Sequence, residues 1–171
     1  MRVCGSVSAG VFHFMTVGHP ARESETLASI RKMLLAMLVL GVIGTSGELV
    51  LLGHFEMPLQ WIPIVLLSAA VIVLAWHLRA PGPASVTTIK VLMAVFVAAG
   101  ALGVVLHYKG NIEFERELNP AEGGFVFLRK TLAGATPVLA PGAMTLLGLI
   151  GLAYTYRHPY AAVLSGQERE I

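Results

Sequence analysis

Histidine and glutamate side chains gather near the predicted ends of apolar segments, where they are candidate ligands for a divalent metal ion. Imidazole and carboxylate groups together suit zinc, manganese or iron(II). Their spacing matches no compact metal-binding motif, although Glu113, Glu115 and Glu117 would share one face of an extended segment. The alternative is a solvated acidic loop. The metal candidates are Glu48, His54, Glu56, His107, Glu113 and Glu115.

Glu48 stands inside an apolar run, where a charged group needs a partner or a proton. A charge at the bilayer centre costs about 2.5–3.5 kcal/mol on insertion scales. Glu48 lies about four residues, or about 6 Å, from the end of its apolar run, so the cost of placing a charge there is smaller than at the bilayer centre. His107 is its candidate partner. The open readings are a proton- or cation-handling carboxylate, a hydrogen-bonded packing residue, and a solvated residue.

Histidines also occur in two pairs that suggest haem b as an alternative cofactor. The first pair is His54 and His107, and the second pair is His77 and His158. Histidines on neighbouring helices can hold a haem between them. All four lie at predicted helix ends rather than within the spans, which weighs against haem.

The composition indicates a membrane protein. The chain has 171 residues, of which 56% are hydrophobic and 13% are charged, against about 25% charged in soluble domains. Its single cysteine, Cys4, excludes an internal disulfide and a CxxC motif. The net charge of +2 is too small to argue for nucleic acid. We find no nucleophile arrangement or glycine-rich phosphate loop, so the sequence gives no argument for an enzyme.

Four apolar runs are long enough to cross a bilayer of about 30 Å as helices. They predict an all-α, four-transmembrane-helix bundle, in which a membrane domain (30–159) follows an N-terminal segment (1–29) and precedes a tail (160–171). Residues 1–14 are a candidate misplaced start, because Met15 opens a more ordinary sequence. An outer loop (107–137) joins the last two spans. The predicted spans are 33–52, 59–78, 86–106 and 138–156.

Lysine and arginine residues predict the orientation. One side carries eight of the 12 and the other carries Lys109, Arg116, Arg129 and Lys130. The positive-inside rule then places both termini in the cytoplasm, in a plasma or inner membrane.

The outer loop contains a predicted amphipathic helix that lies on the membrane interface. Asn119 and Pro120 resemble a helix start, and Phe125, Leu128 and Leu132 would share its apolar face. Further on, Pro137 and Pro141 allow either an irregular entry to the fourth span or an ordinary helix start; we expect the latter.

Weak internal similarity suggests a duplicated two-helix hairpin. A shift of about 59 residues aligns the glycine pairs and brings Glu48 onto His107; the repeat would be parallel. Small residues at i and i+3 let helix backbones approach closely. The predicted helix-packing residues are Gly41, Gly44, Gly100 and Gly103.

The sequence supports three functions in this order. The first is a small structural or accessory subunit that packs in the bilayer with its own copies or with a partner membrane subunit. The second is a proton- or metal-linked transport or sensing protein that uses the outer Glu and His residues. The third is a haem b electron carrier.

Overall fold

The apolar runs fold into helices joined by short turns. The computed structural model describes residues 20–53, 58–134, 138 and 140–160. The elements are α1 (Pro20–Leu51), η1 (Pro58–Gln60), α2 (Trp61–Arg79), α3 (Pro83–Leu118), α4 (Gly124–Ala133) and α5 (Gly142–Thr155). Within these ranges the fold is all-helical, which confirms the predicted class.

Among the described residues, three helical segments are long and apolar enough to cross a membrane: Glu25–Leu51, Pro58–Arg79 and Pro83–Leu118. With its 19 residues, α2 is about 28 Å long, close to the thickness of a hydrocarbon core. The fourth predicted span corresponds to α5, which begins at Gly142 rather than near residue 138 and has 14 residues. At about 21 Å, α5 is shorter than a full span. The protein is therefore an integral membrane protein in which the helix at the fourth predicted span, α5, is short.

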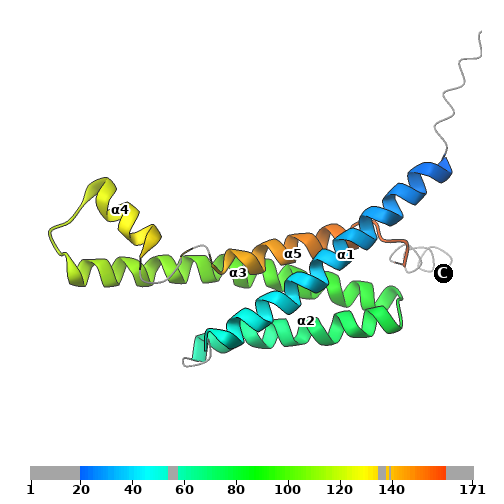
Figure 1. Ribbon diagram of the computed structural model, residues 1–171, viewed down its shortest axis with the longest axis horizontal. Coiled ribbons are helices and arrows are strands. Elements are labelled where there is room, and N and C mark those ends of the chain that lie inside the picture. The colour runs from blue at the N-terminus through cyan, green and yellow to red at the C-terminus, as the bar shows by residue number, and fades with distance from the viewer. Residues whose placement is uncertain (1–19, 54–57, 135–137, 139, 161–171) are drawn as a thin grey trace, which may run out of the picture.

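The chain runs back and forth between two ends of the bundle (Figure 1). One end, which we call the termini end, holds the start of α3 and the ends of α2 and α5. The largest helix contact joins α3 and α5, and smaller ones join α1 to α5, α2 to α3 and α1 to α2. Since α1 and α3 share no extensive contact, α2 and α5 connect them.

Apolar side chains from α1, α2, α3 and α5 form one core. Leu38 of α1, Ala70 of α2, Phe96 of α3 and Leu147 of α5 belong to it. Many large apolar side chains remain outside, such as Ile72, which is 69% exposed. Exposed apolar area on this scale is expected where lipid, rather than water, surrounds the helices.

Glycines set the close approach of α3 and α5. A Cβ atom on Gly100 would lie 2.6 Å from the Thr145 backbone nitrogen, and one on Gly103 would lie 2.7 Å from the Pro141 Cβ atom. From the other side, a Cβ atom on Gly148 would lie 2.7 Å from the Met93 carbonyl oxygen. Each of these positions excludes a side chain, so the two backbones meet directly.

The third long helix continues past the predicted end of its span. With 36 residues, α3 is about 54 Å long, so about 12 residues extend beyond residue 106. The expectation that Glu113, Glu115 and Glu117 share one extended face is wrong, because this segment is helical. In a helix, Glu115 points away from the other two; it is buried, whereas they are exposed.

The predicted amphipathic helix is present as α4, but it begins at Gly124 and not at Asn119. Residues before it form a turn in which the Glu122 backbone N–H donates to the Asn119 carbonyl oxygen. Gly124 has a φ of +68°, a conformation that glycine adopts without strain. The helix therefore starts at the second of the two glycines, and its predicted place on the membrane interface stays a prediction.

Candidate functional site

A buried polar cluster lies at the termini end of the bundle. We call it the histidine cluster, and its members come from three helices and the segment after α5. Each is less than a tenth exposed. Polar side chains in such a place must form hydrogen bonds with one another, because no water is available to replace them. The cluster consists of His77, Ser85, Tyr154 and His158.

Ser85 is held in place by the turn between α2 and α3. Pro83 opens α3, and the Gly82 backbone N–H donates to the Ser85 Oγ atom over 3.1 Å. The Ser85 hydroxyl also lies 3.0 Å from the Gly82 carbonyl oxygen. The side chain thus satisfies backbone groups at the start of α3, as a helix cap does.

His77 joins three helices through its two ring nitrogens. Its Nδ1 atom lies 2.8 Å from the Ser85 Oγ atom, and its Nε2 atom lies 2.6 Å from the Tyr154 hydroxyl oxygen. When the Ser85 hydroxyl donates to Gly82, the Nδ1–H group donates to Ser85 and the Tyr154 hydroxyl donates to Nε2. A proton shift on the imidazole therefore changes the bonds to α3 and α5 together.

His158 completes the cluster. Its ring lies 5.1 Å from the Tyr154 ring and 6.3 Å from the His77 ring, measured between centroids. Burial lowers the pKa of His158, and the positive charge of Arg31 and the nearby His77 lower it further. The neutral imidazole is therefore the form that the fold favours.

The first and last helices are tied together beside the cluster. The Arg31 guanidinium of α1 donates to the carbonyl oxygen of Arg157 over 3.0 Å. Arg157 has a φ of +45°, which is uncommon for a residue other than glycine, and its guanidinium lies over the Tyr156 ring. This turn brings the chain back after α5 and places His158 against His77.

The arrangement of Ser85 and His77 resembles a nucleophile and its base, but its surroundings favour a structural role. The Ser85 side chain is 1% exposed and caps α3, so a substrate has no approach to its oxygen. Among the described residues, every buried side-chain nitrogen and oxygen has a hydrogen-bond partner. The cluster links α2 to α3 and α5 through the hydrogen bonds of His77.

The haem reading does not fit the pair of His77 and His158. Both ring nitrogens of His77 already bond protein groups, whereas a haem iron would need one of them as its ligand. Of the other pair, His54 lies outside the described residues, and His107 is half-buried on α3.

The structure does not bring the predicted metal ligands together. Glu48 is exposed on α1, and His107 lies on α3, with which α1 shares no extensive contact. Glu113 and Glu115 face different sides of α3, and His54 and Glu56 lie outside the described residues. Among the residues that the structure describes, no three His, Cys, Asp or Glu side chains gather as a metal site would require.

The predicted packing glycines differ in their surroundings. Gly100 and Gly103 lie against α5, and a Cβ atom on Gly41 would collide with the Leu147 side chain. No side chain or other element among the described residues lies within 4 Å of such a Cβ atom on Gly44. The face of α1 that carries Gly44 therefore points away from the other described helices.

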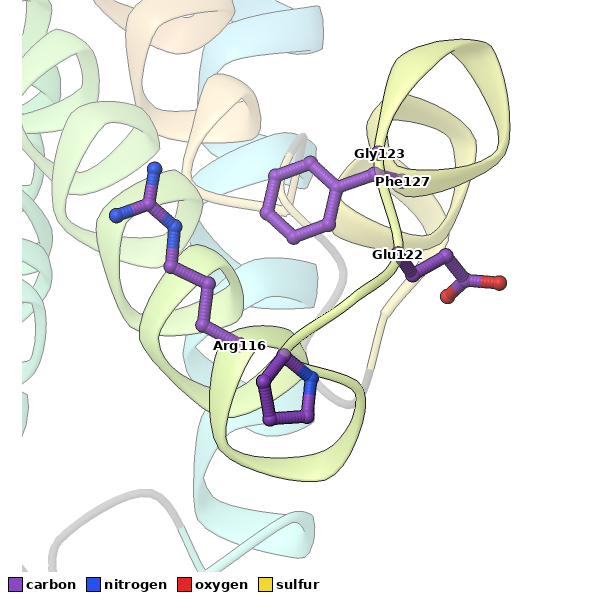
Figure 2. A pocket seen from close by; sticks show the side chains of 5 residues that line it. Arg116, Glu122, Gly123 and Phe127 are labelled. Atoms are coloured by element: carbon purple, nitrogen blue, oxygen red, sulfur yellow. The ribbon is translucent and has the colours of Figure 1, made fainter.

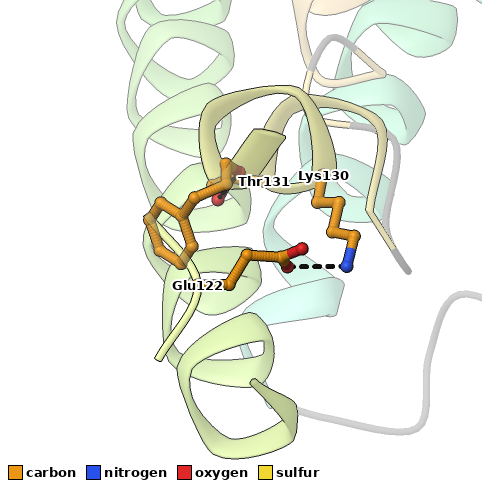
Figure 3. A network of polar contacts seen from close by, with 4 residues as sticks. Glu122, Lys130 and Thr131 are labelled. Atoms are coloured by element: carbon orange, nitrogen blue, oxygen red, sulfur yellow. Dashed lines mark hydrogen bonds and ion pairs between the residues drawn. The ribbon is translucent and has the colours of Figure 1, made fainter. Parts of the chain in front are cut away.

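The far end of α3 and α4 fold into a hairpin (111–133) that projects from the bundle (Figure 1). The Asn111 Nδ2 atom donates to the Thr131 carbonyl oxygen over 2.9 Å, and both residues are buried. The Lys130 Nζ atom lies 2.6 Å from a Glu122 carboxylate oxygen (Figure 3). The buried bond fixes α4 on α3, whereas the half-exposed ion pair adds little.

An open groove of about 500 Å³ lies inside this hairpin. Figure 2 shows the Phe127 ring turned toward the helix that carries Arg116, while the Glu122 carboxylate points away. The groove is lined by Arg116, Pro120, Glu122, Gly123 and Phe127. Without converging polar groups, it is a gap between two helices rather than a ligand site.

Comparison with known proteins identifies no relative: no family model, no curated protein and no solved structure matches this chain.

Proposed function

We propose that the protein is a small accessory subunit of a membrane complex, and that its hairpin (111–133) contacts a partner membrane subunit. One observation carries this proposal: α4 is fixed on α3 by a buried hydrogen bond, yet its apolar stripe remains exposed. Phe125 is 78%, Leu128 42% and Leu132 49% exposed. Helices that bury a stripe at this spacing do so against another helix or in a groove.

The two faces of α4 support a docking role. Thr131 is buried toward α3, where its hydroxyl donates to the Phe127 carbonyl oxygen and its own carbonyl accepts from Asn111. The stripe of Phe125, Leu128 and Leu132 lies on a different face. A pre-ordered helix loses little conformational entropy when it binds, so an exposed stripe on a fixed helix suits recognition.

Photo-crosslinking in native membranes tests this function. A photoreactive amino acid at Leu128 is compared with one at Lys130, which lies on the opposite side of the same helix, beside Glu122. We expect Leu128 to form a discrete adduct with another membrane protein, while Lys130 forms little of it.

Adducts with lipid alone at Leu128 would contradict the accessory role and make α4 an interfacial anchor. Equal adducts at both positions would also contradict it, because the stripe would then have no preference for a partner. An adduct between two copies of this chain would mean that α4 contacts a second copy rather than a different membrane subunit.

A further inference from the structure

Basic side chains gather at the termini end of the bundle, outside the histidine cluster. They come from α1, from the last residue of α2 and from the segment after α5. Lys32, Arg79 and Arg157 are exposed, and Arg31 is half-buried. Each stands at the end of an apolar helical run, where phospholipid headgroups begin. We call these four side chains the basic rim.

The positive charge of the basic rim is not neutralised within the described part of the chain. Among the residues that the structure describes, the one ion pair joins Lys130 to Glu122 in the hairpin at the other end. Among the described side chains at the termini end, Glu25 alone is acidic. It precedes Arg31 by six residues, which is not the spacing of a helical ion pair. The rim therefore presents a net positive surface, which attracts an anion.

Two of these cations are positioned by the fold itself. The Arg31 guanidinium donates to the Arg157 carbonyl oxygen over 3.0 Å, and this bond uses one of its five N–H donors. The Arg157 guanidinium lies 5.6 Å from the centre of the Tyr156 ring. Because the Arg31 side chain contacts the Arg157 backbone, both guanidinium groups belong to one small region of the surface. Guanidinium groups bind phosphate through paired, charge-assisted hydrogen bonds.

Aromatic side chains indicate the depth of the basic rim. Trp76, three residues before Arg79, is 43% exposed, and Tyr156, next to Arg157, is 69% exposed. Tryptophan and tyrosine concentrate at the level of lipid headgroups, where the ring meets apolar surroundings and its polar atom meets water. The rim is therefore expected to meet the surface of the membrane rather than its hydrocarbon core.

We propose that the basic rim binds the headgroup of an anionic phospholipid, whose phosphate group is held by Arg31 and Arg157. Lys32 and Arg79 add positive charge around it. Basic pockets between membrane helices recognise such headgroups. The hairpin (111–133) lies at the opposite end of α3 (Figure 1), so this contact does not depend on the proposed partner of α4.

Thermal unfolding in micelles of a neutral detergent tests the proposal, with phosphatidylglycerol, phosphatidylcholine or inorganic phosphate added. We expect the melting temperature to rise with the amount of phosphatidylglycerol, because a ligand that binds only the folded protein stabilises it. The other two additives should change it little. No rise with phosphatidylglycerol, or an equal rise with phosphatidylcholine, would overturn the proposal. An equal rise with inorganic phosphate would overturn the lipid headgroup in favour of a soluble anion.

Variants locate the site, each compared with its own melting temperature without lipid. Arg157→Gln removes a cation and keeps the carbonyl group that bonds Arg31, so it should need about tenfold more phosphatidylglycerol for the same rise. Arg79→Gln, exposed at the end of α2, should act in the same direction. The control is Lys109→Gln, which removes an exposed cation near the other end of α3 and should behave as wild type. An equal loss in Lys109→Gln would show that overall charge attracts the lipid, and would overturn the basic rim as its site.

Discussion

His77 is the residue through which α2 holds both α3 and α5. Its imidazole accepts or donates at Nδ1 toward Ser85 and at Nε2 toward Tyr154, so one tautomer serves both bonds. Ser85 and Tyr154 are therefore coupled although each bonds a different nitrogen. Networks of this kind are measured by double-mutant cycles rather than by single deletions.

We expect a coupling of about 0.5–1 kcal/mol between Ser85→Ala and Tyr154→Phe in the free energy of unfolding. The reason is that removing either hydroxyl allows His77 to adopt the tautomer that best bonds the remaining hydroxyl, so the two substitutions affect each other. Reversible unfolding in mixed micelles measures the four proteins of the cycle. As a control, the pair Ser68→Ala and Tyr154→Phe should be additive, because Ser68 is exposed on α2. Additivity of Ser85→Ala and Tyr154→Phe would show that the imidazole does not transmit the effect.

His158 makes stability depend on pH. Burial, Arg31 and His77 lower its pKa in the folded protein, so folding favours the neutral ring. The groups around it are Arg31 of α1, His77 of α2, Tyr154 of α5 and the stacked Tyr160. Unfolding then takes up as much as about one proton, and the stabilisation present above pH 6.5 is lost as the pH falls below it.

We expect the melting temperature to fall between pH 7 and pH 5, and His158→Gln to make this decline shallower. Glutamine keeps a polar group but does not titrate. The measurement is thermal unfolding in detergent across this pH range, with His107→Gln on α3 as the matched histidine control. An identical slope in wild type and His158→Gln would contradict the assignment.

At the scale of elements, α3 and α5 depend on glycine where their backbones meet. Gly148→Leu should destabilise the protein by about 1–3 kcal/mol, because the new side chain would meet the Met93 carbonyl oxygen and the Val97 backbone nitrogen. Gly44→Leu is the matched control, since it makes the same change at a position where no other described element lies within 4 Å of the new Cβ atom. The measurement is the free energy of unfolding in micelles at a protein concentration too low for association. Equal losses in both variants would show that helix propensity, not packing, dominates.

The apolar runs predicted the membrane helices well. The polar residues at the end of α3 did not look helical, so its length was underestimated. The run 86–106 ends where Lys109, Glu113 and Arg116 begin, so the end of α3 resembled a loop. Yet no proline stands between Pro83 and Pro120, and Lys109 and Glu113 are spaced for a helical ion pair. The end of α5 was predicted closely and its start was not, because Pro141 delays the helix.

The histidine cluster was only partly visible in the sequence. The sequence pairs His77 with His158 as candidate haem ligands, but it does not point to Tyr154 as their neighbour. Ser85 drew no attention, because a serine near a proline turn is common. What the sequence lacks is the contact between α2 and α5, which are far apart in the chain. Residues at the same depth in the membrane can come into contact, but the packing of the helices determines which of them do.

At the scale of the whole molecule, α5 takes part in the core and in both hydrogen-bonded links at the termini end of the bundle. The Tyr154 bond, the Arg31 bond to Arg157 and the glycine contact with α3 all use this helix or the residues directly after it. The duplication of a two-helix unit stays a prediction. The orientation in the membrane and the partner of α4 also stay predictions.

The dependence on α5 has a consequence for biosynthesis. Among the described helices, α5 leaves the ribosome last, and until it arrives α1 and α3 are joined mainly through α2. The nascent chain therefore holds α1, α2 and α3 in the membrane with the α5-binding glycines of α3 facing lipid or the insertion machinery. The surface of α3 that carries Gly100 is therefore completed only when α5 has been translated.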